Sequence, residues 1–442
     1  MVLALSPLAQ ARTWTEAGSG RKIEAEMVST DGTSVVIALA TGQRFTLPLA
    51  RLSPEDLEFI KKQSPAATSG AAKVNAGAAN GAKQAEADLF DDIKKLQASN
   101  IPVNGEGLKD LEPVDEAIKE YMAEQGIGAL AFAVSRGGKV VHDRVFGWAD
   151  AKLKTPLEPG IRMRVASMTK PVVSATIRTF IAEGKLKMDD KVFTVLELDK
   201  FKEAKGCDKR WKDITIQQLL EHKGGWDRDK SGDTVVRTRD IMNLFNIKEE
   251  EVTPLHAVKY GLTLPLDFDP GERSAYSNYG YTVLARVIEK LSGKPMVEHW
   301  QDSVAKKSGS SSFSLSTSDV TNRQPGEIWY SYNPDYGQKR VPLPLRIEAQ
   351  DGAGALATTA ADYCRFLEHY WISGEPRNGD GYAYSFNGSL PGTTAICSQR
   401  LDGISYTAIA NRRGAPKSDW NGSLRAAIDK ALAKVADKVP RS

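Results

Sequence analysis

A stretch of 25 residues, Ser64 to Asp88, decides how this chain can be divided into folding units, because it contains ten alanines, three glycines and a single sizeable apolar side chain, Val74. A segment of this composition buries too little apolar surface to offset the conformational entropy lost on ordering. We therefore expect a flexible Ala/Gly-rich linker over residues 64–106, in which residues 89–100 can add a short helix. This linker separates a small domain at 12–63 from a large domain at 107–442.

The first eleven residues are mildly apolar and end in Ala9-Gln10-Ala11, a small-x-small pattern typical of signal-peptide cleavage. Because no basic residue precedes the apolar stretch, residues 1–11 are interpreted either as the remnant of an export signal or as a frayed chain end. The first interpretation predicts an extracytoplasmic protein of the periplasm, the cell envelope or the medium, and the second a cytoplasmic one.

Charge and composition argue against several classes of function. The chain carries 59 Lys and Arg against 56 Asp and Glu, a net charge of +3, which gives no reason to expect a nucleic acid or an anionic membrane as partner. No apolar run approaches the roughly 18–20 residues of a transmembrane helix. The three cysteines and five histidines are too few for a disulfide framework or a metal-rich centre, so we expect free thiols and neither a metal nor another cofactor. The sequence also lacks a phosphate-binding loop and a dinucleotide fingerprint.

Residues 12–63 have the pattern of short strands followed by one helix. Asp31-Gly32 is a hairpin turn signal, and Ser53-Pro-Glu-Asp56 is typical of a helix start, so we expect a small β-barrel with a terminal helix. The phrases Arg12-Thr-Trp-Thr15 and Leu47-Pro-Leu-Ala-Arg-Leu-Ser-Pro-Glu-Asp56 resemble the Sla1 homology domain 1 family, which has an SH3-like fold. That resemblance implies a protein partner for the barrel. A barrel that only tethers or spaces is the alternative.

The large domain has predicted strands at both of its ends and helices between them. The expected elements are a helix at 114–125, strands at 129–135 and 139–148, strands at 393–398 and 405–410, and a last helix at 419–436. Residues 169–371 are mainly helices and long loops. The strands of the two ends should therefore meet in one sheet while the middle forms a second lobe, which defines an α/β (α+β) fold.

Ser167-Met-Thr-Lys170 precedes a helical pattern over residues 171–184, so its serine and lysine are expected on one helix face. A serine hydroxyl needs a base within hydrogen-bond reach to act as a nucleophile, and a desolvated lysine can lose its proton to serve as that base. The spacing alone is not specific, because Ser19-Gly-Arg-Lys22 and Ser303-Val-Ala-Lys306 share it. The alternative is a helix-capping serine followed by a solvated lysine.

Two further motifs could complete such a site. Tyr276-Ser-Asn278 is the only Tyr-x-Asn of the chain, and in an extended segment its tyrosine and asparagine face the same way. A tyrosine can relay a proton, and an asparagine can hold a lysine or a substrate carbonyl. Phe386-Asn387-Gly388-Ser389 begins the C-terminal strand pair, where the N–H groups of Ser389 and Ser167 could form an oxyanion hole. Taken singly, the first motif also fits a packed loop tyrosine and the second an ordinary turn.

In this order the three motifs resemble the penicillin-recognising serine hydrolases, the β-lactamase-like family of class C β-lactamases, D,D-peptidases and related esterases. The resemblance runs from about Leu111 to Ala433. Its phrases are Arg164-Val-Ala-Ser167-Met-Thr-Lys170-Pro, Ile214-Thr-Ile-Gln-Gln-Leu-Leu-Glu-His222, Asp269-Pro-Gly-Glu-Arg-Ser-Ala-Tyr276-Ser-Asn278-Tyr-Gly280 and Gly352-Ala-Gly-Ala-Leu-Ala-Thr-Thr-Ala-Ala-Asp362. It implies a two-lobed β-lactamase-like fold with an antiparallel sheet and a helical lobe.

The resemblance also implies a role for each motif residue. Ser167 would be the acylated nucleophile, Lys170 its general base and Tyr276 the proton relay. Asn278 would position the lysine or the substrate, and the N–H groups of Ser167 and Ser389 would hold the oxyanion.

One position departs from the family pattern, because Phe386-Asn387-Gly388 stands where the family has Lys-Thr-Gly or His-x-Gly. The missing cation or imidazole argues against carboxylate-bearing β-lactams and D,D-peptides. The predicted function is therefore a serine hydrolase that forms an acyl-enzyme on a small-molecule ester or amide, in the first place an esterase. A D,D-peptidase or weak β-lactamase is the alternative, and a catalytically impaired binding protein of the same fold is the second.

The remaining candidates have weaker signals. His222 is expected to be structural, at a helix end. An aromatic group either walls a substrate cleft or packs within loops: Trp226, Trp329, Tyr330, Tyr332 and Tyr336. No G-x-S-x-G is present, so the sequence offers no nucleophile elbow for an α/β-hydrolase.

Overall fold

The computed structural model describes residues 12–15, 22–30, 34–38, 44–49, 52–63, 96–150, 152–198, 207–318, 324–330, 346–379, 382–413 and 419–441. The chain divides into two compact units, residues 1–80 and 81–442, and each is considered by itself. Over the described ranges, no helix combines the length and the apolar character needed to cross a membrane. The expectations for residues 1–11 and for the Ala/Gly-rich stretch 64–88 lie outside the described residues.

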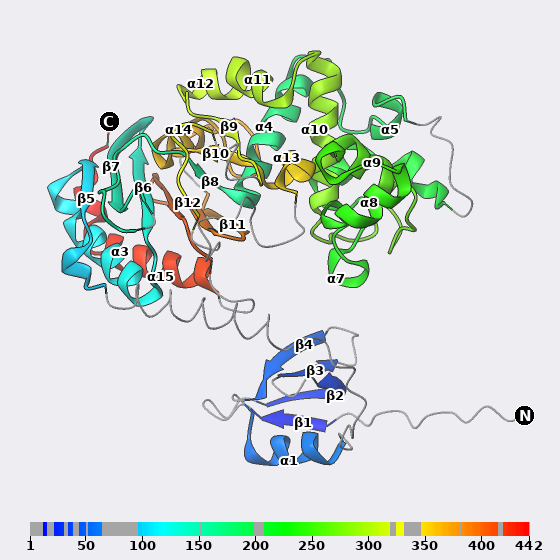
Figure 1. The fold of residues 1–442 in the computed structure, drawn as a ribbon, viewed down its shortest axis with the longest axis horizontal. Helices are drawn as coiled ribbons and strands as arrows, with labels where there is room; N and C mark the ends of the chain where they lie inside the picture. Colours follow the sequence, from blue (N-terminus) through cyan, green and yellow to red (C-terminus); the bar gives the residue numbers. More distant parts are fainter. Residues whose placement is uncertain are drawn as a thin grey trace, which may run out of the picture. The chain divides into compact units, whose positions relative to one another are not determined.

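The first unit contains a four-stranded antiparallel sheet in the order β1-β2-β3-β4 and one helix (Figure 1). Its elements are β1 (Arg12–Thr15), β2 (Lys22–Thr30), β3 (Ser34–Ala38), β4 (Arg44–Pro48) and α1 (Pro54–Gln63). Its core consists of Trp14, Ala25, Val35, Ile37, Leu52 and Ile60. The predicted strands and terminal helix are therefore present as a meander followed by a helix.

The buried carboxylate of Asp56 joins the two ends of this unit. It accepts a hydrogen bond from the Thr15 N–H (2.7 Å) and forms an ion pair with Arg12 (2.7 Å). Ser53 caps α1, because its Oγ lies 3.3 Å from the N–H of Asp56. The two phrases on which the Sla1 resemblance rests thus contact each other, while the SH3-like assignment remains a prediction.

The second unit is built on a six-stranded antiparallel sheet in the order β11-β12-β13-β6-β7-β5. Its strands are β5 (Val103–Glu106), β6 (Ala129–Arg136), β7 (Lys139–Gly147), β11 (Tyr384–Leu390), β12 (Thr393–Gln399) and β13 (Ile404–Ala410). β13 pairs directly with β6, so strands from both ends of the unit meet in one sheet, as the sequence predicts. Figure 1 shows this sheet beside a lobe made of helices.

Helices cover both faces of the sheet. α3 (Glu112–Gln125) and α15 (Trp420–Leu432) lie together on one face, and α14 (Ala360–His369) packs on β6 and β13 from the other. Side chains point alternately to the two faces along β6, and large ones lie on one face while small ones lie on the other. Leu130, Phe132 and Val134 face α3 and α15, whereas Ala129, Ala131 and Ala133 face the other way.

Small side chains on the second face let α14 approach closely, and Cys364 Sγ of α14 lies 3.3 Å from the Ala133 carbonyl oxygen. Cys364 and Cys397 are buried free thiols, and Cys207 is also free.

The helical lobe lies between the two groups of strands in sequence. Its helices are α4 (Thr169–Ala182), α5 (Val192–Val195), α6 (Ile216–Leu220), α7 (Arg228–Ser231), α8 (Thr238–Phe245), α9 (Pro254–Gly261), α10 (Asn278–Ser292), α11 (Met296–Trp300), α12 (Lys306–Ser308) and α13 (Asp351–Gly354). Short 3-10 turns include η4 (Ala166–Met168), η5 (Lys209–Asp213), η6 (Thr234–Val236), η7 (Glu249–Glu251) and η10 (Ile347–Gln350), and η8 (Gln301–Ala305) is a π-turn.

Two features differ from the sequence prediction. A small antiparallel sheet in the order β8-β10-β9, with strands β8 (Met163–Arg164), β9 (Ser314–Leu315) and β10 (Leu356–Thr358), lies within the predicted helical region. Residues 103–106, which the sequence places in the linker, form β5 and pair with β7. The preceding Ile101 is buried in the core under α3. Such short strands were missed because two to four residues are too few for an alternating pattern to be recognised.

Candidate active site

Ser167 lies in the 3-10 turn η4, immediately before α4, and not in the first turn of a helix as the sequence pattern suggests. The preceding Ala166 has a φ of +51°, a left-handed conformation that is strained for a residue with a side chain. Thr169 holds the turn, because its Oγ1 donates to the Ala166 carbonyl (2.7 Å) and accepts from the N–H of Leu356 (3.1 Å).

The side chain of Lys170 is buried, with 1% of the residue exposed, and its Nζ lies among three oxygen atoms. The nitrogen lies 3.3 Å from Ser167 Oγ, 2.7 Å from Asn278 Oδ1 and 2.7 Å from the Ala353 carbonyl oxygen. Removal from water lowers the pKa of Lys170 well below its ordinary value.

This environment suits a neutral amine. A neutral lysine has two N–H donors and one lone pair, and the two short contacts are to acceptors that have no proton to give. The lone pair is then left for the hydroxyl of Ser167, the longest of the three contacts. The arrangement can therefore take a proton from the serine.

Tyr276 contacts the same hydroxyl from the other motif, and its phenol lies 2.7 Å from Ser167 Oγ. Burial raises the pKa of Tyr276 to about 12, so the phenol keeps its proton at neutral pH and can donate it. His222 stacks on the tyrosine ring with 4.8 Å between ring centroids, and its Nδ1 accepts from the N–H of Ser277 (3.1 Å). Burial lowers the pKa of His222 to about 4, so its imidazole is neutral and it supports Tyr276 by packing.

Asn278 is the first residue of α10. Its side-chain amide lies between Lys170 and a carboxylate: Oδ1 accepts from the lysine, while Nδ2 donates to Asp233 Oδ2 at 2.5 Å. Asp233, just before η6, therefore fixes which end of the amide faces the lysine. Asp233 was not predicted from the sequence, since no local pattern marks a contact between residues 45 positions apart.

The carbonyl of Ala353 was also missed, because a backbone acceptor leaves no trace in the sequence. It belongs to the short helix α13, whose first residue, Asp351, is buried and paired with Arg286 of α10. Asp351 Oδ1 also accepts from the N–H of Gly352 (2.7 Å). One helix, α10, thus carries both Asn278 and the arginine that anchors the second partner of Lys170.

β11 approaches the serine through Gly388. A Cβ at this position would collide with the carbonyl oxygen of Val165, two residues before Ser167, so glycine is required for the strand to pack against this segment. Asn421 of α15 fixes the strand pair, because its Nδ2 donates to the carbonyls of Gly388 (3.1 Å) and Ala395 (2.9 Å).

The other residues of this motif alternate along β11. Phe386 is half-buried and packs against the core that contains Val165, whereas Ser389 is exposed. Asn387 is half-buried, and its Oδ1 has no hydrogen-bond partner among the described residues.

The aromatic candidates belong to the core. Trp226 is buried and packs on Tyr279 with 4.5 Å between centroids. Trp329 Nε1 donates to the Trp148 carbonyl, and the hydroxyl of Tyr330 lies 2.8 Å from the Arg164 N–H. These residues support loop packing, while Tyr332 and Tyr336 lie outside the described residues. Within the described ranges, no three His, Cys, Asp or Glu side chains gather into a potential metal site.

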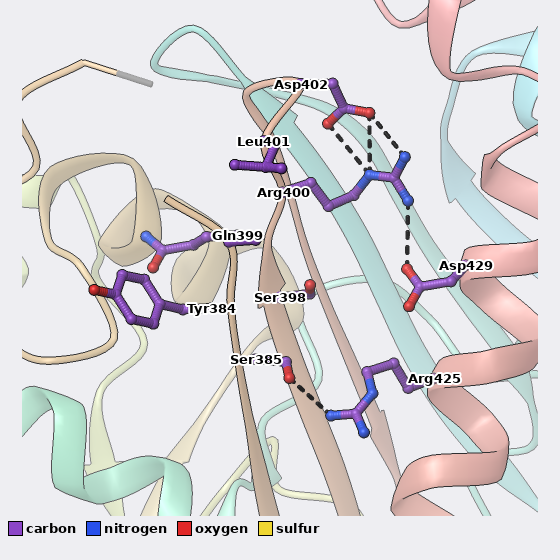
Figure 2. Close-up of a pocket in the computed structure, with 10 residues that line it drawn as sticks. Tyr384, Ser385, Ser398, Gln399, Arg400, Leu401, Asp402, Arg425 and Asp429 are labelled. Atoms are coloured by element: carbon purple, nitrogen blue, oxygen red, sulfur yellow. Dashed lines mark hydrogen bonds and ion pairs between the residues drawn. The ribbon is translucent and has the colours of Figure 1, made fainter. Parts of the chain in front are cut away.

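A separate cavity of about 460 Å³ lies between α15, the first residues of β11, the last residues of β12 and the turn that follows β12 (Figure 2). Figure 2 shows Arg400 between Asp402 and Asp429, and Arg425 donating to Ser385 (2.8 Å). Ser385 faces α15, on the side of β11 opposite to Phe386 and Gly388. The cavity is therefore distinct from the group around Ser167.

Comparison with known proteins places this geometry in a family. The family model described as Beta-lactamase matches residues 114–395. The chain is 34% identical over 226 residues to the FimD protein of serogroup D of Dichelobacter nodosus, named for fimbrial assembly, covering 50% of this chain and 52% of that protein. It is 28% identical over 185 residues to the esterase EstB of Burkholderia gladioli, covering 41% of this chain and 44% of the esterase. The chain thus spans about half the length of the curated relatives it matches.

A solved structure has the same fold. The D-amino acid amidase from Ochrobactrum anthropi SV3 matches with a TM-score of 0.57 and 17% sequence identity, covering 75% of this chain and 100% of the amidase. This likeness confirms the predicted β-lactamase-like fold with its antiparallel sheet and helices.

Proposed function

Because the chain belongs to the beta-lactamase family, we propose that it is a serine hydrolase that forms an acyl-enzyme at Ser167 and acts on small neutral esters. The observation that carries the proposal is the position of the Ser167 hydroxyl, 3.3 Å from the Lys170 amine and 2.7 Å from the Tyr276 phenol. A serine between a buried amine and a protonated phenol has both a base and an acid within reach.

In the proposed reaction, Ser167 Oγ gives its proton to the neutral amine of Lys170 and attacks the ester carbonyl carbon. The carbon–oxygen bond to the alcohol breaks, and the phenol of Tyr276 protonates the departing oxygen. The ammonium of Lys170 then returns a proton to Tyr276. Water repeats the sequence on the acyl-enzyme, which releases the acid and restores the serine hydroxyl.

The negative charge on the carbonyl oxygen needs donors that are fixed before the reaction. We propose the backbone N–H groups of Ser167 and Ser389 for this role. The close packing of Gly388 on the Val165 carbonyl supports the assignment, since it brings this part of β11 to the segment that carries the nucleophile.

Phe386 supports a neutral substrate. It lies two positions before Gly388 and therefore on the same face of β11, where it presents an aromatic ring and no charge. A carboxylate-bearing substrate would find no cation at this position. The name of the related EstB protein, an esterase, agrees with the same choice.

The structural similarity to a D-amino acid amidase keeps amides as a second substrate class, and a D,D-peptidase or weak β-lactamase remains the alternative. The third candidate is an impaired binding protein of the same fold. It is disfavoured because Lys170 and Tyr276 both lie within hydrogen-bond distance of Ser167, and Asn278 lies within hydrogen-bond distance of Lys170.

For the first unit we propose a protein-binding module of the Sla1 homology domain 1 type at 12–63, tethered to the hydrolase by the Ala/Gly-rich segment. We further propose that the protein acts outside the cytoplasm, on the small-x-small pattern of residues 9–11. Fractionation of cells that express the full-length chain tests this location.

The experiment for the function compares hydrolysis of p-nitrophenyl acetate and butyrate with hydrolysis of nitrocefin. Ser167→Ala should abolish ester hydrolysis, and Ser303→Ala, the serine of the other Ser-x-x-Lys in this domain, is the matched control that should retain it. Faster turnover of nitrocefin than of both esters would favour the β-lactamase alternative. A folded wild type without any turnover would favour the binding protein.

A further inference from the structure

We propose that Arg228 and Asp233 are positioning residues that act on Lys170 in opposite directions, Arg228 favouring the neutral amine and Asp233 the ammonium. Together they would set the pH range in which Ser167 is acylated. The inference rests on the proposed function, because it concerns the base of that same site. Both residues belong to one short segment, which contains α7 and the start of η6.

Arg228 and Lys170 approach the same aromatic ring. The guanidinium carbon of Arg228 lies 4.5 Å from the centroid of the Tyr276 ring, and the Lys170 Nζ lies 4.7 Å from that centroid. An arginine keeps its charge at every accessible pH, so the repulsion between two neighbouring cations falls on the lysine. Arg228 pairs only weakly with the carboxylate of Asp229, which is exposed and lies 3.7 Å away.

Asp233 reaches Lys170 through one intervening side chain. Its carboxylate accepts from Asn278 Nδ2 at 2.5 Å, and the other end of that amide accepts from the lysine at 2.7 Å. A negative charge at this distance stabilises the ammonium form. Asp233 therefore opposes Arg228 while keeping the amide in the orientation that Lys170 needs.

The other polar groups around the lysine carry no free charge. Burial raises the pKa of the phenols of Tyr276, just before α10, and Tyr281, within α10, whose rings both lie near Nζ. Burial lowers the pKa of His222, which follows α6. Behind the Ala353 carbonyl of α13, Asp351 is paired with Arg286.

Among the described residues around this amine, Arg228 and Asp233 thus remain as the opposed charges. The pKa of Lys170 responds in the directions that this geometry implies. Burial lowers it most, Asp233 raises it and Arg228 lowers it.

The test is the pH dependence of kcat/KM for p-nitrophenyl acetate in wild type, Arg228→Gln and Asp233→Asn. Loss of activity at low pH reports protonation of Lys170. In Arg228→Gln this acid limb should move to higher pH, so that the rate at a pH on the limb falls about threefold. In Asp233→Asn it should move to lower pH, while the amide oxygen of the new residue still accepts from Asn278.

Arg273→Gln is the matched control. Arg273 is as exposed as Arg228 (43% against 44% of the side chain) and also lies over an aromatic ring, but that ring is Phe268, and its guanidinium is paired with Asp227. Its acid limb should coincide with that of the wild type.

Two outcomes would overturn the inference. Suppose the wild type shows Ser167-dependent turnover, but the acid limb of Arg228→Gln coincides with that of the wild type or lies at lower pH. This result contradicts the inference and leaves the proposed function intact. A wild type without Ser167-dependent turnover contradicts the proposed function as well. If Asp233→Asn is inactive, the direction in which the acid limb of Arg228→Gln moves decides by itself whether the inference holds.

Discussion

Replacing Lys170 by methionine tests the assignment of the base most sharply, because methionine keeps an unbranched, buried side chain and removes only the amine. In the proposed reaction the Ser167 hydroxyl then has no acceptor for its proton at 3.3 Å. General-base catalysis contributes about 10²–10⁴-fold to a rate, and each factor of ten corresponds to about 1.4 kcal/mol of activation free energy. The acylation rate of Lys170→Met should therefore fall by about 10²–10⁴-fold, which is roughly 3–6 kcal/mol of activation free energy.

The loss of stability should be smaller than the two lost hydrogen bonds alone would suggest. The substitution leaves Asn278 Oδ1 and the Ala353 carbonyl without their 2.7 Å donor, and each buried acceptor left unpaired costs about 1–3 kcal/mol. It also removes an amine that is unfavourable to bury, which offsets part of that cost. The melting temperature of the hydrolase unit should consequently shift by only a few degrees.

The assay is the pre-steady-state burst of p-nitrophenol from p-nitrophenyl acetate, which reports acylation directly. Lys306→Met is the matched control, since Lys306 also follows a serine by three positions but is exposed. It should acylate at the wild-type rate. A folded Lys170→Met protein that acylates within about tenfold of the wild type would refute the reasoning, because the proton of Ser167 would then have to go elsewhere.

Three further predictions address the surroundings of the serine. Tyr276→Phe should slow acylation by an ethyl ester by about 10²-fold or more but acylation by a p-nitrophenyl ester much less, because only the poorer leaving group needs a proton; equal losses in the two acylation rates would argue against the relay. Gly388→Ala should lower the rate of the acylation burst by about 10²-fold, because the new Cβ meets the Val165 carbonyl oxygen and displaces β11. An unchanged burst rate would show that acylation does not depend on the position of β11. The pKa of His222 is about 4 in the folded protein against 6.5 in the unfolded chain, so the unfolded chain binds the extra proton between these values. The free energy of unfolding of the wild type should therefore fall by roughly 3 kcal/mol as pH falls from 6.5 to 4. Denaturant titrations at several pH values should show a weaker pH dependence of this free energy in His222→Gln, and an equal pH dependence would contradict the burial argument.

Local sequence signals predicted the elements that carry the site. The β6–β7 hairpin follows from the Gly137-Gly138 turn between two predicted strands, and α4 follows from its helical pattern. Ser167, Lys170, Tyr276 and Asn278 were proposed from motif order, and the structure brings them together.

The groups that complete the site were not predictable in this way. Asp233 meets Asn278 across 45 positions of sequence, and the Ala353 carbonyl meets Lys170 across 183. The packing of α10 against η6 creates the first contact, and the packing of α13 against α4 creates the second. The 3-10 turn at Ser167 was missed for a similar reason. It depends on Thr169, whose hydroxyl is held by the distant backbone N–H of Leu356.

The most direct test of the account is to label the folded wild-type protein with a fluorophosphonate and to locate the adduct by peptide mass spectrometry. We expect a single adduct on Ser167, formed more slowly in Lys170→Met and at the wild-type rate in Lys306→Met. A folded protein that stays unlabelled, or that carries the adduct on another residue, would contradict the proposal that Ser167 is the nucleophile.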